Sequence, residues 1–467
     1  MSIWKRSLYC LVTFILGLPV AGAASFEPLP LLDPGAVSGR FYQNPHSVYD
    51  IGDPFILPAE GHFYLFATGG TVGFNVWRTN DLRSFDKQKA LPKVSWASGD
   101  YWAPEVVAYD GRYVMLFTAR RKADKSLRIG IALADTPEGP YTDPLDAPLF
   151  DLGYAAIDAT LLMDGDIPYL YYVRDCSENV VRGRHESHIY GVRMSPDLLS
   201  MEGEPVLLTV PDQEWEMEQG GDYLWNEGPA VLVRDGLYYL FYSAHFFADK
   251  RYGVGVAVSE HPLGPFTKQQ NNPLLWYIEN ETKVMVSGPG HNSFFMVGDE
   301  LFTAYHTHTY PLAPSGNRQL NIDRAGFHAD GTAFIDGPAR VPKLLPFSMT
   351  GLVNHAPEAV GEGIAPLADA DTCSSPASAH YAWRGTNASL KWDVPRTADM
   401  LMLCFAGGNT AAGQLVINER FTVDVGSGGT ADNMLILHFA PIAIESLRME
   451  WDGEVSVGEL YVIGSAE

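Results

Sequence analysis

Short runs of alternating apolar and polar residues, broken by turn dipeptides, fill most of this chain. Five times, an acidic or imidazole residue precedes an apolar run, a turn containing Gly or Asp, and a second run rich in Tyr and Phe. Alternation with period two predicts strands, and Asp-Gly is typical of tight hairpin turns. Each copy therefore predicts a β-hairpin. The residues that begin the five hairpins are Asp53, Glu105, Asp158, Glu227 and His291.

A second pair of short strands follows each hairpin, as in residues 75–79 and 129–134. Two hairpins make a four-stranded unit, and radially arranged units of this kind form the blades of a propeller. The five anchor residues are 52 to 69 residues apart, close to the roughly 40 to 50 residue period of propeller blades. The pattern predicts an all-β fold, with a five-bladed β-propeller over residues 27–345.

The anchor residues are candidates for chemistry because of where they lie in the repeat. The innermost strands of a propeller run in one direction along the central axis, so residues at the same position of each repeat form a ring. We predict that the five anchors form such a ring. A solvated turn needs no acid at the start of a buried strand, and buried carboxylates are costly unless they have a role.

A change in composition divides the chain near residues 340–365, where prolines interrupt the pattern. Beyond it, short alternating runs predict a separate β-sandwich over residues 355–467. A sandwich of this size is compatible with a carbohydrate-binding module or with a packing module, and the sequence leaves both open. It also leaves open whether Cys373 and Cys404 form a disulfide.

The N-terminal residues 1–23 have the pattern of a secretory signal peptide. Lys5 and Arg6 precede an apolar stretch, which ends near an Ala-Gly-Ala cleavage site at residues 21–23. The stretch is shorter than the ~18 residues expected of a membrane span, and no later segment qualifies. We therefore predict export to the periplasm or the extracellular space, without a membrane span.

The charge of the chain narrows the class of partner. The formal net charge is −24, and removal of the leader with its two cations leaves −26. Nucleic acids and anionic membranes both attract basic surfaces, so neither is an expected partner. A neutral carbohydrate suits this charge better. The sequence does not indicate an oligomeric state.

The residues around the anchors resemble the motifs of glycoside hydrolase family 43, over about residues 45–340. Five phrases carry the resemblance in order: Tyr49-Asp-Ile-Gly-Asp53-Pro, Tyr101-Trp-Ala-Pro-Glu105, Ala156-Ile-Asp158-Ala, Trp225-Asn-Glu227-Gly-Pro and Ser287-Gly-Pro-Gly-His291. A single Asp-Pro or Glu-Gly-Pro would mean little. Five phrases in order at blade spacing form a specific signal.

The resemblance implies a glycosidase that inverts the anomeric carbon, with a role for each of three carboxylates. It assigns Asp53 as the general base, Glu227 as the general acid, and Asp158 as the residue that raises the pKa of the acid. Inversion requires one protonated and one ionised carboxyl, about 6.5 to 9.5 Å apart so that water fits between base and sugar. An anion at Asp158 would disfavour ionisation of Glu227.

Five further residues are candidates for substrate contact, some with a structural alternative. Trp102 and Phe74 would offer aromatic faces to a sugar ring. By resemblance, Arg324 would place a cation against the substrate or the base, unless it forms a structural ion pair. Glu105 would touch the sugar or fix the Trp102 loop, and His291 would face the axis.

The resemblance implies no cofactor for the chemistry, but many relatives hold a structural calcium ion in the axial channel near the position of His291. Calcium prefers oxygen ligands, so one imidazole is weak support, and a channel filled by water or sodium stays open. The Gly-Pro-Gly-His phrase favours α-L-arabinofuranosyl substrates. A β-xylosidase, an endo-arabinanase and a non-catalytic carbohydrate-binding propeller remain alternatives.

Overall fold

The computed structural model describes residues 26–70, 73–88, 94–218, 221–368, 380–406, 411–426 and 433–465. The predicted signal peptide and Cys373 lie outside these ranges. The chain forms two compact units, which are described separately. One unit is Asn44–Asp323, and the other combines residues up to Gln43 with residues from Arg324 onward.

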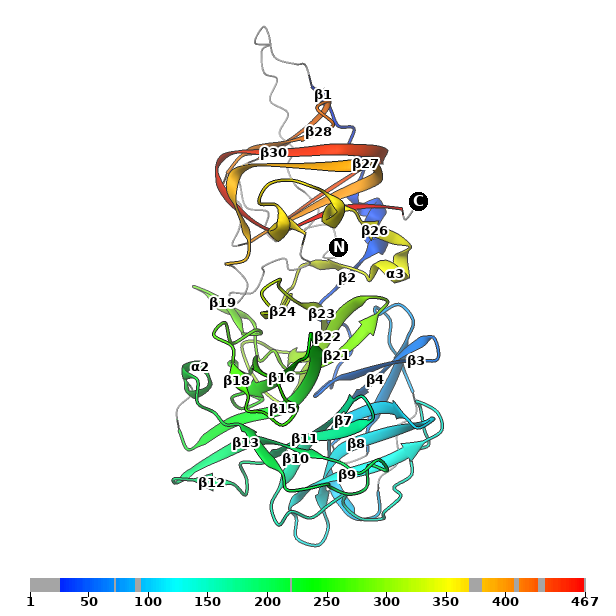
Figure 1. The fold of residues 1–467 in the computed structure, drawn as a ribbon, viewed down its shortest axis with the longest axis vertical. Coiled ribbons are helices and arrows are strands. Elements are labelled where there is room, and N and C mark those ends of the chain that lie inside the picture. The colour runs from blue at the N-terminus through cyan, green and yellow to red at the C-terminus, as the bar shows by residue number, and fades with distance from the viewer. Residues whose placement is uncertain are drawn as a thin grey trace. The chain divides into compact units, whose positions relative to one another are not determined.

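Most strands of the predicted propeller lie in the Asn44–Asp323 unit, where they follow one another blade by blade in chain order (Figure 1). The first two blades contain β3 (Phe55–Ala59), β4 (His62–Ala67), β5 (Asn75–Thr79) and β6 (Asp86–Lys87), then β7 (Ala97–Tyr109), β8 (Arg112–Arg121) and β9 (Leu127–Ala134). The third blade contains β10 (Ala156–Asp164), β11 (Ile167–Arg174), β12 (Val180–Val181), β13 (Arg184–Arg193) and β14 (Val206–Thr209).

The fourth blade follows the short helix α2 (Glu214–Met217) and contains β15 (Tyr223–Arg234), β16 (Leu237–Ala244), β17 (Gly253–Ser259) and β18 (Thr267–Lys268). After a hairpin of β19 (Ile278–Asn280) and β20 (Lys283–Val286), the fifth blade contains β21 (Gly290–Val297), β22 (Glu300–His308), β23 (Arg318–Phe327) and β24 (Ala333–Ile335). The all-β, five-bladed prediction is confirmed.

The turn dipeptides behave as their chemistry predicts. Asp110 and Gly111 join β7 to β8 with φ of 47° and 72°, and Asp235 and Gly236 join β15 to β16 with φ of 50° and 78°. Two successive residues with positive φ are characteristic of the turn type whose twist matches a β-hairpin. These turns set the register of the inner two strands of their blades.

The Tyr- and Phe-rich runs form the second strand of each blade and are buried on both faces. In β8, residues 114–119 are buried without interruption. Separate apolar clusters lie between the first and second, second and third, and third and fourth blades. Face-to-face packing of blades explains why these strands do not alternate between apolar and polar side chains.

Two features tie neighbouring blades together near the axis. The start of β15 pairs in parallel with the start of β13, with His185 opposite Tyr223 and Ser187 opposite Trp225. At the other junction, the segment that leads into the first blade runs beside β23, where the Ile51 N–H donates to the Arg318 carbonyl at 3.1 Å. The second contact brings the first and fifth blades together at Asp53.

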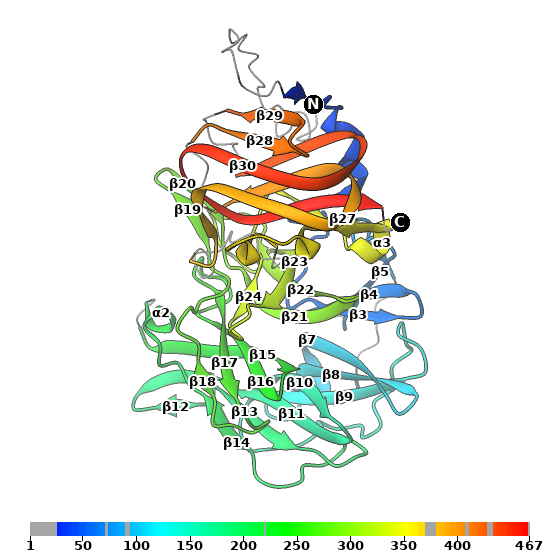
Figure 2. The same cartoon turned by 45° about the horizontal axis from the view of Figure 1, so that its top comes forward.

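The second unit is also rich in strands, and Figure 2 shows β27 and β30 as its long curved strands. Its elements are β1 (Glu27–Pro28), η1 (Pro34–Arg40), β2 (Phe41–Gln43), β25 (Pro342–Leu344), α3 (Phe347–Thr350), β26 (Leu352–Asn354), η2 (Ala356–Glu358), η3 (Ala365–Leu367), β27 (Trp383–Phe405), β28 (Gly413–Ile417), β29 (Phe421–Val425) and β30 (Met434–Ser465). In the part of the chain that the structure describes, no helix is long and apolar enough to span a membrane.

The predicted propeller bounds of 27–345 need correction at both ends, because residues 27–43 and 324–345 group with the C-terminal unit. β1 pairs in parallel with β29. The Arg40 guanidinium makes two bonds of 2.7 and 2.6 Å to the Asp399 carboxylate. A sequence pattern cannot reveal this pairing, because its partners are more than 350 residues apart.

Candidate active site

The axial end of each inner strand is built around a dipeptide whose first residue has positive φ. In the second to fifth blades this dipeptide is a bulge, where the pairing with the next strand shifts register. In the first blade it precedes β3. The five dipeptides line one cavity: Asp53-Pro54, Ala103-Pro104, Asp158-Ala159, Gly228-Pro229 and His291-Asn292. Their first residues have φ between 45° and 55°.

This geometry corrects the predicted ring of five anchors. Asp53, Asp158 and His291 do occupy equivalent positions. Glu105 follows its bulge, whereas Glu227 precedes its bulge and pairs with Ser243. Register shifts of one or two residues separate the five anchors into three positions. Bulges re-aim side chains in this way and are frequent beside active sites.

A ring of five hydrogen bonds connects the blades at the bulges. In each bond, the backbone N–H of a bulge residue donates to a side chain of the preceding blade, and the last bond closes the ring from the first blade to the fifth. The pairs are Ala103 to Thr68 Oγ1 (3.1 Å), Asp158 to Thr118 Oγ1 (2.9 Å), Gly228 to Asp158 Oδ2 (3.2 Å), His291 to Ser243 Oγ (2.8 Å) and Asp53 to His306 Nδ1 (3.3 Å).

The third blade departs from this pattern in an informative way. Thr118, Ser243 and His306 each lie opposite the residue that precedes a bulge. The equivalent residue of the third blade is Val173, which has no acceptor. The Asp158 carboxylate accepts the Gly228 N–H instead. Asp158 is therefore hydrogen-bonded to β15 at Gly228, the residue that follows Glu227.

Asp53 lies among cationic and hydrogen-bonding groups. Arg318 Nη1 donates to Asp53 Oδ1 at 2.8 Å, His291 Nδ1 lies 3.2 Å from the same oxygen, and the Thr68 hydroxyl donates to Oδ2. Burial would raise the pKa of Asp53, but the Arg318 guanidinium above all, with His291 and the Thr68 hydrogen bond, outweighs it and lowers the pKa below its usual range. Asp53 is thus ionised at any pH at which the protein would work.

A glycine makes room for the cation beside Asp53. A Cβ on Gly52 would lie 2.0 Å from Nη2 of Arg318, so a side chain at this position would displace the guanidinium. Glycine is required where another group approaches the backbone this closely. The Gly-Asp dipeptide of the first motif therefore specifies both the carboxylate and the space for its partner.

Glu227 lies in the opposite kind of environment. The Tyr252 hydroxyl donates to Glu227 Oε1 at 2.9 Å. Burial raises the pKa of Glu227 well above its ordinary value, and the nearby Asp158 raises it further. Burial raises the pKa of Asp158 as well, to about 6. Because Asp158 accepts a backbone N–H, the proton shared by this pair resides on Glu227.

Two further predicted residues, Trp102 and Glu105, lie on either side of the bulge in the second blade. Trp102 precedes the Ala103 bulge, as Glu227 precedes the Gly228 bulge, and its half-buried ring packs against the apolar cluster between the third and fourth blades. Glu105 lines the cavity, but its Oε1 accepts from Thr160 Oγ1 at 2.7 Å and from the Leu161 N–H at 3.2 Å. Glu105 thereby joins the second blade to the third.

Two predicted contacts with substrate are not supported by the positions of the side chains. Phe74 is buried and packs edge-to-face on Tyr101 and Phe117 in the core between the first two blades. The Arg324 guanidinium donates to the carbonyl oxygens of Leu344 and Leu345 in the C-terminal unit. The cation beside Asp53 is Arg318.

Several residues of the site were missed by the sequence prediction. Arg318 and Tyr252 carry no motif that marks them. His306 is fully buried and accepts the Asp53 N–H. Burial and Arg318 lower the pKa of His306 well below its usual value, so the ring is neutral. The Tyr305-His306 pair in the second strand of the last blade was the available signal.

The donor set does not match a calcium site. Among the described residues, no group of three or more His, Cys, Asp or Glu side chains is arranged to hold a metal ion. His291 Nδ1 already contacts Asp53, and calcium prefers oxygen ligands. The calcium ion implied by the resemblance stays a prediction, and no step of the mechanism below depends on it.

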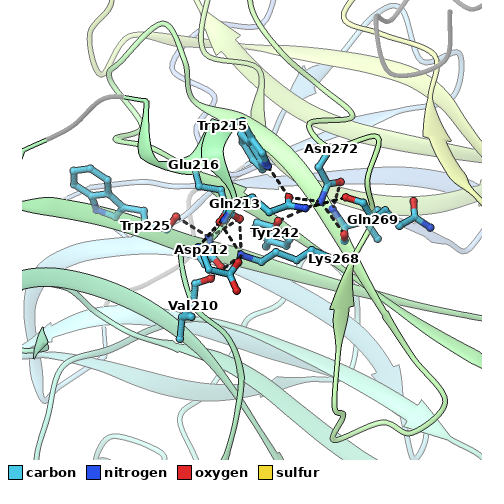
Figure 3. Close-up of polar contacts among 12 residues, drawn as sticks. Val210, Asp212, Gln213, Trp215, Glu216, Trp225, Tyr242, Lys268, Gln269 and Asn272 are labelled. Carbon is cyan, nitrogen blue, oxygen red and sulfur yellow. Dashed lines mark hydrogen bonds and ion pairs between the residues drawn. The ribbon is translucent and has the colours of Figure 1, made fainter. Parts of the chain in front are cut away.

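A buried polar cluster supports the strand that carries Glu227 (Figure 3). Glu216 of α2 is fully buried, and both of its carboxylate oxygens lie 2.7 Å from Lys268 Nζ. Asn226, which precedes Glu227, donates to Glu216 Oε1 at 3.2 Å. A buried charge with paired and hydrogen-bonded oxygens fixes geometry at a low net cost. The insertion before β15 thus orients the acid.

Comparison with known proteins agrees with this geometry. The sequence profile of Glycosyl hydrolases family 43 matches residues 42–333. The "Beta-D-galactofuranosidase xynD" of Aspergillus niger is 30% identical over 55% of this chain and 72% of its own length. The "Alpha-L-arabinofuranosidase 43" of Humicola insolens is 28% identical over 62% and 63%. The chain therefore spans less than two thirds of the latter relative.

A solved structure of a "thermostable family-43 glycoside hydrolase" is also similar. It is 43% identical and has a TM-score of 0.62, over 65% of this chain and 99% of the solved one. The profile covers more than half of the chain, and three acids of its motifs, Asp53, Glu105 and Asp158, line the axial cavity. The protein is a member of glycosyl hydrolases family 43, and thus a glycoside hydrolase.

Proposed function

We propose that the protein is an exported, inverting glycosidase that releases α-L-arabinofuranosyl groups from neutral plant-type polysaccharides or oligosaccharides. The observation that carries this proposal is that two carboxyls of one site have opposite surroundings, a guanidinium and an imidazole at Asp53 and a phenol at Glu227. Asp53 is held ionised by Arg318, while burial keeps the proton on Glu227. An inverting hydrolase needs this pair of states at once.

In the proposed mechanism, each carboxyl has one task. Asp53 accepts a proton from a water molecule as the water attacks the anomeric carbon, and Arg318 and His291 hold the carboxylate in place. Glu227 gives its proton to the leaving oxygen, while Tyr252 orients its other oxygen. Asp158 stays ionised and opposes early loss of that proton.

Support for an arabinofuranosyl substrate comes from the Gly-Pro-Gly-His phrase and from the names of relatives. These include an α-L-arabinofuranosidase, an endo-arabinanase of Bacillus subtilis and a galactofuranosidase. Export is proposed from residues 1–23, which have the pattern of a signal peptide. The net charge of −24 favours a neutral substrate over a polyanion.

The test is a comparison of nitrophenyl α-L-arabinofuranoside, β-D-xyloside and β-D-galactofuranoside with linear arabinan, with proton NMR of the first product formed. The proposal expects the highest kcat/KM on the arabinofuranoside and a product of inverted configuration. Faster release of xylose would change the proposed sugar from arabinose to xylose but leave the proposed inverting mechanism unchanged. A retained anomer, or no release from any substrate by a folded protein that binds arabinan, would overturn the proposal.

A further inference from the structure

Two fully buried rings, those of Tyr252 and His306, are stacked on one another beside the candidate active site. Their centroids are 5.4 Å apart and their planes differ by 8°. Neither side chain is exposed to solvent. Tyr252 immediately precedes β17 of the fourth blade, and His306 lies on β22 of the fifth. The stack therefore crosses the junction between these two blades.

Each ring is hydrogen-bonded to a different carboxyl residue of the site. The Tyr252 hydroxyl donates to Glu227 Oε1 at 2.9 Å. His306 Nδ1 accepts the backbone N–H of Asp53 at 3.3 Å and lies 3.7 Å from Asp53 Oδ1. A continuous chain of contacts thus joins the two carboxyl residues through the two rings.

The backbone leaves space for this stack at Gly290. A Cβ on Gly290 would lie 2.3 Å from Cδ1 of the Tyr252 ring. Gly290 also pairs with His306 between β21 and β22. Its φ is not positive, so close approach of the ring, and not backbone conformation, requires a glycine here. The second glycine of the Gly-Pro-Gly-His phrase is therefore explained by the Tyr252 ring.

Tyr252 is also fixed by the turn that precedes it. Its backbone N–H donates to the Asp249 carbonyl at 3.1 Å. The Arg251 guanidinium closes the turn, because its Nε and Nη2 donate to the two carboxylate oxygens of Asp249 at 2.8 and 2.9 Å. The turn and the contacts with Gly290 and His306 together hold the ring in one position.

We propose that the Tyr252–His306 stack positions both catalytic carboxyls, so that the acid and the base are placed jointly. This inference rests on the roles proposed for Asp53 and Glu227. It adds two positioning residues with separable tasks, because the Tyr252 hydroxyl acts on the acid alone, whereas its ring also acts on the base through His306. Inversion depends on the separation of the two carboxyls, and a misplacement of about 1 Å can cost about 10²-fold in rate.

The experiment measures kcat/KM on a dinitrophenyl pentoside, whose leaving group needs no proton, and on a pentose disaccharide, whose leaving group needs one. Tyr252→Phe keeps the ring and removes the hydroxyl, so the ratio of disaccharide to dinitrophenyl activity should fall by about tenfold. Tyr252→Leu removes the ring, so its activity on the dinitrophenyl substrate should also fall, by about 10²-fold.

Tyr171→Leu is the matched control. Tyr171 is also fully buried, and its hydroxyl donates one hydrogen bond, to the Pro262 carbonyl at 2.8 Å. Loss of this ring should lower the free energy of unfolding but keep both kcat/KM values close to those of the wild type. An equal loss of activity in Tyr171→Leu would overturn the inference, because removal of any buried ring would then have the same effect.

Two results with the Tyr252 variants would also overturn the inference. One is equal activity of Tyr252→Leu and Tyr252→Phe on the dinitrophenyl substrate, because the ring would then have no effect on the base. The other is a wild-type ratio in Tyr252→Phe. If Tyr252→Leu does not fold, Gly290→Ala displaces the ring without removing it, and wild-type dinitrophenyl activity in that variant would have the same meaning. A wild-type enzyme that cleaves neither substrate would instead refute the proposed function itself.

Discussion

Asp53 and Glu227 are both partly buried carboxyl groups, and their surroundings shift their pKa values in opposite directions. Asp53 has a guanidinium, an imidazole and a hydroxyl around it. Glu227 has one phenol and a neighbouring carboxylate. Burial acts in the same direction on both, so the cations make the difference. The same side-chain chemistry thus gives one carboxyl with a lowered pKa and one with a raised pKa.

Replacing Arg318→Met should change the pH dependence of the reaction. The pKa of Asp53 is lowered in the protein, so the base is ionised well below neutral pH and its activity is lost only as pH falls through that pKa. Without Arg318, this acidic limb should move upward by roughly 1 to 3 units.

A profile of kcat/KM against pH measures the shift, and Arg318→Lys should show a smaller one. Arg324→Met is the control, because its guanidinium bonds carbonyl groups of the C-terminal unit. An acidic limb that stays in place in Arg318→Met would contradict the assigned role of Arg318.

The three carboxylates were predictable at this scale because each lies in a short motif at the start of a strand. Arg318 was not, because β23 offers two arginines six residues apart and the pattern does not distinguish them. The hydrogen bond from the Ile51 N–H to the Arg318 carbonyl and the space at Gly52 place Arg318, and not Arg324, beside Asp53. Both depend on contacts across the junction of the first and last blades.

At the scale of elements, the bulges and the ring of hydrogen bonds set the positions of the site residues. A residue other than glycine seldom adopts positive φ, so Asp53, Asp158 and His291 need an external constraint. The ring supplies it, because each of their N–H groups is fixed by the preceding blade. The blades thus position the catalytic side chains through their backbones.

The Thr118→Val substitution should test the ring of hydrogen bonds between the blades with little change in side-chain shape. The Asp158 N–H would lose its acceptor, and an unsatisfied buried donor costs about 1–3 kcal/mol of the free energy of unfolding. Denaturant titration would measure this loss, and kcat should fall with it because Asp158 is less well placed.

Thr209→Val is the matched control, because Thr209 is also buried and its hydroxyl has no hydrogen-bond partner among the described residues. This change should leave stability equal or slightly higher. Equal stability of the two variants would show that the Thr118 bond contributes nothing.

Hairpins and their turns could be predicted from the sequence because period-two patterns and Asp-Gly dipeptides are local signals. The bulges could not. Glu105 and Glu227 both begin apolar runs, yet one follows its bulge and the other precedes it. The residue opposite each bulge is equally hard to predict, because Val173 differs from Thr118 by a single hydroxyl-for-methyl exchange that no strand pattern detects.

For the whole molecule, buried carboxyls make stability depend on pH. Burial raises the pKa of Glu105 to about 7. A group whose pKa is raised by folding contributes stability below its unfolded pKa, and this contribution is lost as pH rises through the folded pKa. The Glu105 contribution should therefore be complete below about pH 4.5 and lost by about pH 8.

Glu105→Gln should remove this dependence, because glutamine can accept the same bonds from Thr160 and Leu161 without a charge. The difference in free energy of unfolding between variant and wild type should grow in favour of the variant by about 3 kcal/mol from pH 4.5 to 8. Denaturant titrations at several pH values measure it. A difference that is constant with pH would mean that Glu105 does not titrate in this range.

The division into a propeller and a strand-rich C-terminal unit was also predictable, since prolines interrupt the pattern between the two. The place of residues 27–43 was not. β1 and the Arg40–Asp399 ion pair join the N-terminal segment to the C-terminal unit, and only the folded chain brings these residues together. Long-range pairing of short edge strands leaves almost no signal in a single sequence.

The most direct test of the central claim is the dependence of rate on the leaving group in two variants. Glu227→Gln should hydrolyse a dinitrophenyl pentoside, whose leaving group needs no proton, at close to the wild-type rate, and lose about 10²- to 10⁴-fold on a disaccharide. Asp53→Asn should be inactive on both, because water activation is needed in each case. An equal loss on both substrates in Glu227→Gln, or substantial activity of Asp53→Asn, would contradict the assignment of acid and base.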